Sequence, residues 1–71
     1  MIEYTVILER GDTNWSAYVP DLPGCVAAAE TRDETEKLIR EAVALHIQLL
    51  REDGDPIPES RVEASSVMVP A

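Results

Sequence analysis

The sequence is poor in cysteine, aromatic residues and positive charge. Its 71 residues include one cysteine, no phenylalanine and only 6 Lys or Arg against 14 Asp or Glu. The single Cys25 excludes an internal disulfide, which agrees with a cytoplasmic location. No apolar run approaches the roughly 18 residues that a membrane span needs, and the first residues lack the layout of a signal peptide. We therefore predict a cytoplasmic protein with no membrane contact.

The charge balance constrains the partner. A formal net charge of -8 repels phosphate backbones and attracts basic surfaces. The few basic residues are scattered along the chain and form no continuous patch. Direct binding of nucleic acid by this chain alone is disfavoured, and a basic protein partner is favoured.

The length predicts one domain, residues 1–71, with a small core. A chain of this size buries only about 60% of the surface that it exposes when unfolded, so oligomerisation is a common way to add stability. We therefore expect a homo-oligomer, either a dimer or a tetramer.

Three strands are predicted in the first half of the chain. Ile2, Tyr4, Val6 and Leu8 alternate with polar residues at a period of two, which is typical of a half-buried strand. The turn-forming run 11–14 and the strand-favouring residues 15–19 complete a hairpin. Residues 25–29 form the third strand, whose small side chains leave room for a bulky element.

A helix is predicted from about Arg32 to Glu52. Thr31 and Glu34 match the capping-box pattern, and Gly54 is a suitable C-terminal cap. Pairs at a spacing of four, Asp33 with Lys37 and Glu36 with Arg40, suit weak ion pairs.

The apolar arc of this helix is wider than one sheet face requires. On a helical wheel, one line of residues comprises Leu38, Ala42, Leu45 and Leu49, and a second group lies beside it. The whole arc covers roughly 200°, whereas packing on one sheet needs a little over 100°. We predict that the second group forms an oligomer interface, and it comprises Ile39, Val43, His46, Ile47 and Leu50.

The C-terminal segment 61–69 alternates imperfectly and is predicted to be a fourth strand. The predicted order is β-β-β-α-β. This is an α+β fold with one helix packed on a mostly antiparallel sheet.

Few residues suggest catalysis. Nucleotide-binding and metal-binding signatures are absent, and nothing in the spacing of Glu3, Glu9, Glu41 and Glu63 requires them to converge on a metal. Cys25 is expected to be a small buried hydrophobe, and His46 a core or interface histidine. We predict no catalytic residue, no metal and no cofactor.

The second strand carries two aromatic residues on opposite faces. One of Trp15 and Tyr18 can fill the core while the other points outward, and outward aromatic side chains are enriched at binding hot spots. Packing and binding are equally consistent with the sequence.

The stretch YVPDLPGC at positions 18–25 closely resembles the motif that joins the second and third strands in the HicB-like antitoxin family. The similarity continues through the helix start at 31–36, residues 40–42 and the segment EDGDPIP at 52–58. It covers about four-fifths of the chain in the same order. This combination is more specific than any one of its parts.

The resemblance implies a partial ribonuclease H-like fold that has lost nuclease activity. It also implies a non-enzymatic antitoxin that binds a small basic HicA-type toxin, an mRNA-cleaving ribonuclease, and covers its active site. Many family members carry a C-terminal DNA-binding domain, and none is expected in this chain. Two alternatives remain, an orphan oligomeric HicB-like domain without a toxin, and a residual metal-dependent nuclease.

The opening motif is also the predicted contact region. Pro20, Pro23 and Gly24 are expected to fix the turn, because proline fixes φ and glycine accepts a positive φ. Asp21 and Leu22 would then be displayed at its tip. The predicted partner-binding residues are Trp15, Tyr18, Asp21 and Leu22.

Overall fold

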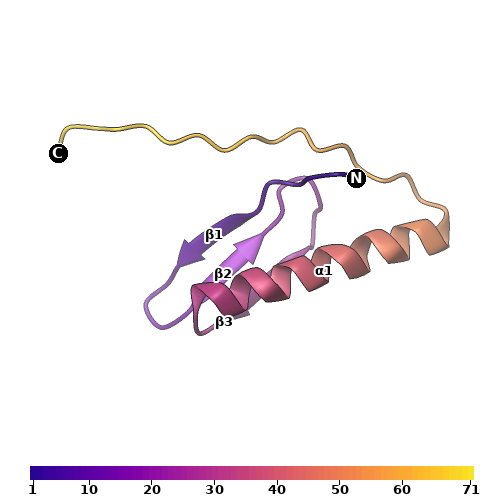
Figure 1. The fold of residues 1–71 in the computed structure, drawn as a ribbon, viewed down its shortest axis with the longest axis horizontal. Coiled ribbons are helices and arrows are strands. Elements are labelled where there is room, and N and C mark those ends of the chain that lie inside the picture. The colour runs from indigo at the N-terminus through magenta and orange to yellow at the C-terminus, as the bar shows by residue number, and fades with distance from the viewer.

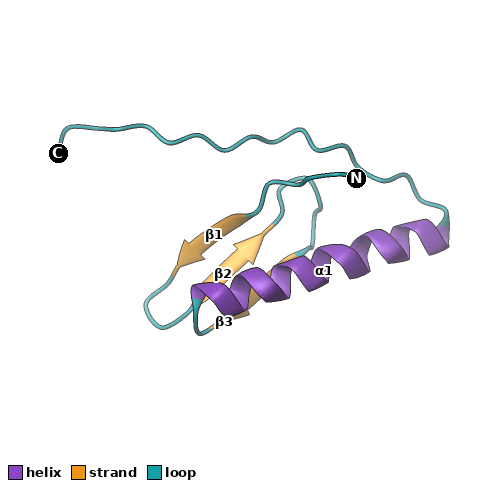
Figure 2. Cartoon of the chain, viewed as in Figure 1, coloured by secondary structure: helices purple, strands orange, loops and turns teal.

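The computed structural model describes all residues from Met1 to Ala71 as one antiparallel sheet with one helix packed on it (Figures 1 and 2). The strands are β1 (Ile7–Arg10), β2 (Trp15–Tyr18) and β3 (Val26–Ala29), in the spatial order β1-β2-β3. The helix α1 (Arg32–Asp53) follows β3 directly. The predicted α+β class is confirmed, and its single helix covers one face of the sheet.

The first hairpin forms where the alternating pattern predicted it, but its first strand is shorter. β1 begins at Ile7, so residues 2–6 of the expected strand carry no strand assignment. Leu8 pairs with Ala17 and Arg10 with Trp15 across the hairpin. The Gly11 amide donates to the Asn14 carbonyl at 2.7 Å and closes the connection. β1 pairs only with β2, and β2 ends at Tyr18, which lies opposite Ile7. The residues before Ile7 therefore have no strand to pair with.

The inner face of the sheet is lined by small residues, which allows α1 to pack closely. Leu8, Ala17 and Ala27 face one another across the three strands. Ala17 is 2% exposed, and α1 packs more extensively on β3 and β2 than on β1. The small side chains of the third strand therefore have the predicted effect, and α1 lies toward the β3 side of the sheet.

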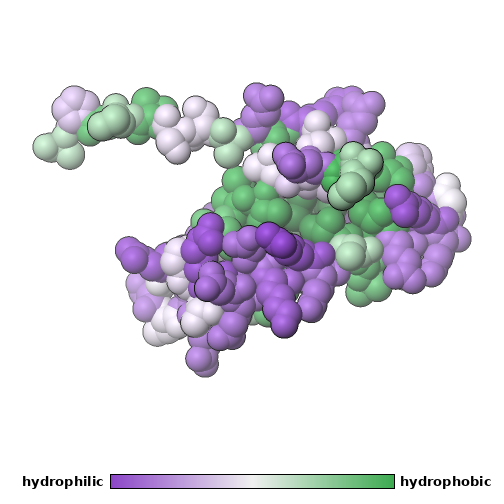
Figure 3. Space-filling model, in the orientation of Figure 1, coloured by the Kyte–Doolittle hydropathy of each residue, from purple (hydrophilic) through white to green (hydrophobic).

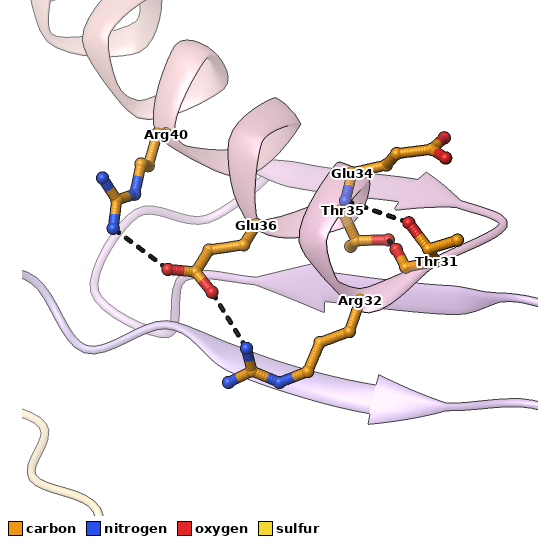
Figure 4. Close-up of polar contacts among 6 residues, drawn as sticks. All are labelled: Thr31, Arg32, Glu34, Thr35, Glu36 and Arg40. Carbon is orange, nitrogen blue, oxygen red and sulfur yellow. Dashed lines mark hydrogen bonds and ion pairs between the residues drawn. The ribbon is translucent and has the colours of Figure 1, made fainter.

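Both ends of α1 follow the predicted capping chemistry. The Glu34 amide donates to the Thr31 hydroxyl at 3.2 Å, although the Glu34 carboxylate points away and makes no reciprocal bond (Figure 4). At the other end Gly54 has φ 71°, and the amides of Gly54 and Asp55 donate to the carbonyls of Arg51 and Leu50. This pair of bonds is a Schellman motif, which needs the left-handed conformation that glycine accepts.

One of the two predicted ion pairs along α1 forms. Glu36 accepts from Arg40 at 3.0 Å and also from Arg32 at 3.0 Å, so one carboxylate bridges two guanidinium groups (Figure 4). The expected pair between Asp33 and Lys37 is not made. All three side chains of the network are at least one-third exposed, so solvent screens these pairs and their contribution to stability is small.

The hydrophobic core is small and lies between the sheet, the 19–25 turn and the middle of α1. It consists of five buried residues, which are Ala17, Val19, Leu22, Cys25 and Ile39. Partly buried side chains from the N-terminal segment, β1, β3 and α1 surround them. The expectation that Cys25 is a buried hydrophobe is confirmed, since it is 4% exposed.

The predicted fourth strand at 61–69 is wrong. The chain beyond α1 carries no helix or strand, and residues 63–71 are all exposed. Figure 1 shows this segment running away from β1 to the C-terminus, which lies far from the sheet. Hydrogen bonds hold Val62 and direct the following residues past β1, so Val67, Met68 and Val69 remain 83%, 98% and 76% exposed. We call residues 63–69 the C-terminal arm.

Candidate functional site: the turn, the arm and the groove

The turn between β2 and β3 holds the start of the C-terminal arm. One carboxylate oxygen of Asp21, Oδ2, accepts from the backbone amides of Arg61 at 2.9 Å and Val62 at 3.1 Å. These contacts join positions about forty residues apart in the sequence. Asp21 is therefore engaged within the chain, where its charge strengthens two main-chain hydrogen bonds.

Two side chains of the N-terminal segment complete the anchor. The Thr5 hydroxyl donates to the Val62 carbonyl at 2.6 Å, and the Tyr4 hydroxyl donates to the Pro58 carbonyl at 2.5 Å. Neither hydroxyl could be selected from the sequence, because the acceptors are main-chain atoms more than fifty residues away. Together with Asp21 they fix the position of Val62 and hence the direction in which the arm leaves the domain.

The expectation that Leu22 is displayed at the tip of the turn is wrong. Its side chain is 0% exposed and belongs to the core. The backbone explains this position: the Leu22 amide donates to the Val19 carbonyl at 3.0 Å, and the Leu22 carbonyl accepts from the Cys25 amide at 3.0 Å. Two successive tight turns fold the residue back under the sheet. An apolar residue between two prolines here plugs the end of the core.

The residues that were expected to shape this turn lie around Leu22. Gly24 has φ 85°, a left-handed conformation that other residues rarely adopt. Pro23 and Gly24 are exposed, and Pro20 is half-buried. The turn therefore needs a residue that accepts a positive φ at position 24, and Gly24 provides it.

The two aromatic residues of β2 lie on opposite faces of the sheet, as predicted. Trp15 is half-buried on the inner face that α1 covers, and Tyr18 is 41% exposed on the outer face. Tyr18 stands between Ile7 and Val26, its register partners on β1 and β3. Val26 is 64% exposed, so the outer face carries a short apolar row, Ile7–Tyr18–Val26, with no element packed over it.

Three of the five residues predicted as an oligomer interface on α1, Ile39, Val43 and Ile47, lie in or against the core. Ile39 is 0% exposed and is a core residue, so its assignment to an exposed contact surface is wrong. Val43 and Ile47 pack against the core, and His46 and Leu50 are half-buried. The outward line on α1 is instead Leu38, Leu45 and Leu49, exposed by 42%, 56% and 50%. The helical wheel found both groups, but it could not decide which one faces the sheet.

A groove lies between the N-terminal segment and α1. It exists because α1 packs mainly on β3 and β2 and covers the β1 side of the inner face less completely. Figure 3 shows it as a continuous green band between the charged outer surface of α1 and the N-terminal segment. Its part beside β1 has a volume of about 1030 Å³. We call it the N-terminal groove, and its apolar lining includes Tyr4, Val6, Leu8, Val43 and Ile47.

The rim of this groove is charged. Three charged residues line its part beside β1, and they are Arg32, Glu36 and Arg40, the bridged network of Figure 4. An apolar floor with charged edges is suited to binding an apolar chain segment.

The structure offers little for chemical catalysis. No three His, Cys, Asp or Glu side chains come together in a way that could hold a metal ion, so the considered convergence of Glu3, Glu9, Glu41 and Glu63 does not occur. Burial raises the pKa of the Cys25 thiol, which disfavours the reactive thiolate. Every buried side-chain nitrogen and oxygen has a hydrogen-bond partner. No helix in the structure combines the length and the apolar character needed to cross a membrane.

Comparison with known proteins connects this fold to a described family. Residues 4–69 match the model of a family described as the HicB-like antitoxin of a bacterial toxin–antitoxin system. An uncharacterised 14.9 kDa protein of Haemophilus phage HP1 is 33% identical over 80% of this chain. Antitoxin HicB 2 of Photorhabdus laumondii is 28% identical over 99% of this chain. The chain spans 43% of the length of the phage protein and 51% of the length of that antitoxin.

A solved structure shows the same arrangement. A chain of the HicA3 and HicB3 toxin–antitoxin complex superposes with a TM-score of 0.70 and 30% sequence identity, over 84% of this chain and 70% of that chain. The family match spans nearly all residues described above, including the motif at 18–25 and the anchored segment at 58–62. The chain belongs to the HicB-like antitoxin family of bacterial toxin–antitoxin systems.

Proposed function

We propose that this protein is a non-enzymatic, cytoplasmic antitoxin that binds a small basic HicA-type toxin and neutralises it by covering its active site. The observation that carries the proposal is the likeness to a chain of a toxin–antitoxin complex at a TM-score of 0.70 and 30% identity. At that level both the fold and part of the sequence are shared. The partial ribonuclease H-like description of the fold belongs to the same proposal, and the β-β-β-α order supports it.

The charge of the chain supports a basic partner. A net charge of -8 on 71 residues creates a negative field that speeds the approach of a basic toxin and opposes the binding of RNA itself. A toxin that cleaves mRNA must present a basic surface to its substrate. An acidic protein that binds this surface competes directly with the RNA.

The outer face of the sheet is the proposed contact surface. Of the predicted partner-binding residues, Tyr18 is the one that the fold leaves outward and unengaged, and the apolar row Ile7–Tyr18–Val26 surrounds it. Trp15 faces α1, Leu22 is in the core, and Asp21 holds the arm. Tyrosine is enriched at interface hot spots because its ring is large and apolar and its hydroxyl remains polar.

The test begins with the isolation of the partner. The tagged protein, purified from its host at moderate salt, is expected to bring down a small basic protein in near-stoichiometric amount. That protein should cleave mRNA when alone and stop cleaving when this chain is added. Recovery of the chain alone would support an orphan oligomeric domain instead, and RNA cleavage by the purified chain itself would support a residual nuclease.

The contact surface is then tested with a matched pair of variants. Tyr18→Ser should weaken toxin binding by about 30-fold, equivalent to ~2 kcal/mol at a hot spot. Leu45→Ser removes a side chain of similar exposure from the opposite side of the molecule and should leave the affinity within about threefold. Equal affinities for both variants would exclude the outer sheet face as the contact. Isothermal titration calorimetry at two salt concentrations also checks the charge effect, because steering by the net charge must weaken as salt rises.

A further inference from the structure

The C-terminal arm is exposed along its whole length and ends in an apolar run. Val67, Met68 and Val69 form a consecutive apolar run at 76% to 98% exposure. Figure 3 shows the arm as a separate projection from the body of the molecule. A run of this kind at the end of an extended segment is suited to pairing as a β-strand with a sheet edge.

The sheet has a free edge that matches the arm. β1 pairs with β2 on one side and with nothing on the other. Uncovered strand edges present unpaired main-chain donors and acceptors, and folded proteins usually cover them. α1 also packs less extensively on β1 than on β2 and β3, so the N-terminal groove opens beside β1. An added strand on β1 would satisfy the edge and roof the groove at once.

The alternation of a strand matches the arm to this groove. Side chains two positions apart lie on the same face of a strand, so Val67 and Val69 would point together toward the groove and Met68 toward solvent. The groove lining that they would meet is aliphatic, with Val6 and Leu8 from one side and Val43 from α1. The arm is seven residues long and spans about 23 Å when extended. It is therefore longer than the four-residue strand β1 and can pair along the whole of it.

The anchor at Val62 directs the arm away from its own β1. Asp21 holds the Arg61 and Val62 amides, and Thr5 holds the Val62 carbonyl. Beyond this point the arm and β1 diverge, as Figure 1 shows. The edge of β1 and the arm that would fit it are thus both present in each molecule, but the anchor separates them.

We propose that the arms are exchanged between two copies of this chain. The arm of each copy adds as a fourth strand to the β1 edge of the other, and its Val67 and Val69 fill the N-terminal groove of that partner. The interaction is reciprocal, which is the arrangement of a closed twofold dimer, and it adds buried apolar area to a core of only five residues. The fourth strand that the sequence predicted would then exist in the dimer, where the neighbouring molecule supplies it. This proposal does not depend on toxin binding.

The oligomeric state of the isolated full-length chain tests the proposal. Sedimentation velocity over a range of concentrations should show a dimer. The variant Val67→Ser with Val69→Ser should raise the dimer dissociation constant by about 100-fold, because each dimer loses four buried valines. Both side chains are exposed in the single chain, so the variant should keep the fold of each monomer, and the circular dichroism signal of α1 should be unchanged. Met68→Ser, on the other face of the arm, is the matched control and should raise the constant by less than about tenfold.

Hydrogen exchange locates the acceptor edge. Amides of β1 should become more protected as the concentration rises in the wild type, and should show no concentration dependence in the double valine variant. A chain that remains monomeric at all concentrations would overturn the proposal. A dimer that persists in the double variant would also overturn it and would point to Leu38, Leu45 and Leu49 as the interface. Protection of the arm only after addition of the co-purified toxin would assign the arm to that protein. Toxin is added only in the last of these measurements. A failure of the arm-exchange proposal can therefore be distinguished from a failure of the proposed antitoxin function.

Discussion

Replacement of Leu22 by alanine should remove a large fraction of the stability of this domain. Leu22 is one of five core residues and is 0% exposed, so its truncation to alanine leaves a cavity. The two prolines and the hydrogen-bonded turns around it hold the backbone in place, so the surrounding structure cannot move in to fill that cavity. Buried Leu→Ala changes cost about 2–5 kcal/mol. At about 0.05–0.15 kcal/mol per residue, a chain of 71 residues has a free energy of unfolding of ~4–11 kcal/mol. We expect a loss of about 3 kcal/mol, which corresponds to a fall in melting temperature of roughly 12–24 °C.

Leu45→Ala is the matched control for this prediction. The same atoms are removed, but Leu45 is 56% exposed on the outer side of α1, so the free energy of unfolding should change by less than about 0.5 kcal/mol. Urea denaturation followed by circular dichroism measures both variants at one low protein concentration. If Leu22→Ala fails to fold, Leu22→Met keeps the volume and should lose less than about 1.5 kcal/mol. Equal losses for Leu22→Ala and Leu45→Ala would refute the placement of Leu22 in the core.

Three further predictions follow from the turn, the thiol and the helix cap. Asp21→Ala removes the acceptor of two amides, so hydrogen exchange at Val62 should accelerate while exchange in the sheet core stays unchanged; equal acceleration everywhere would mean that the carboxylate supports the whole fold. Burial raises the pKa of Cys25, so the unfolded chain ionises first, and stability should be retained below about pH 8.5 and fall as the pH rises toward the folded pKa. The Cys25→Ala variant should lose that part of the pH dependence in urea titrations, and an identical slope in both proteins would contradict it. Gly54→Ala should cost about 1 kcal/mol, because φ 71° is strained for alanine although no atom lies within 4 Å of the added methyl group, and an unchanged urea midpoint would exclude this role for the glycine.

The local elements could be predicted from the sequence because their causes are local. Each of these signals determines the backbone conformation of residues only a few positions away. They are the period-two alternation, the turn-forming run at 11–14 and the capping residues Thr31 and Gly54. They placed a hairpin, a third strand and a helix whose start at Arg32 was correct and whose observed end, Asp53, is one residue past the prediction. The motif at 18–25 also indicated the family, because it resembles the family's motif and is followed by further similar segments in the same order.

Tertiary structure alone decided which surface each side chain occupies. Leu22 and Ile39 were assigned to contact surfaces, but the turn geometry and the position of α1 over β3 put both in the core. The role of Asp21 depends on Val62, which is 41 positions away, and no periodicity can report a contact at that distance. The C-terminal segment has the composition of a strand, yet strand formation needs a partner edge, and the anchor at Val62 carries the segment past its own. Sequence therefore determined which elements this chain can form, and the tertiary arrangement determined which of them find a partner within one molecule.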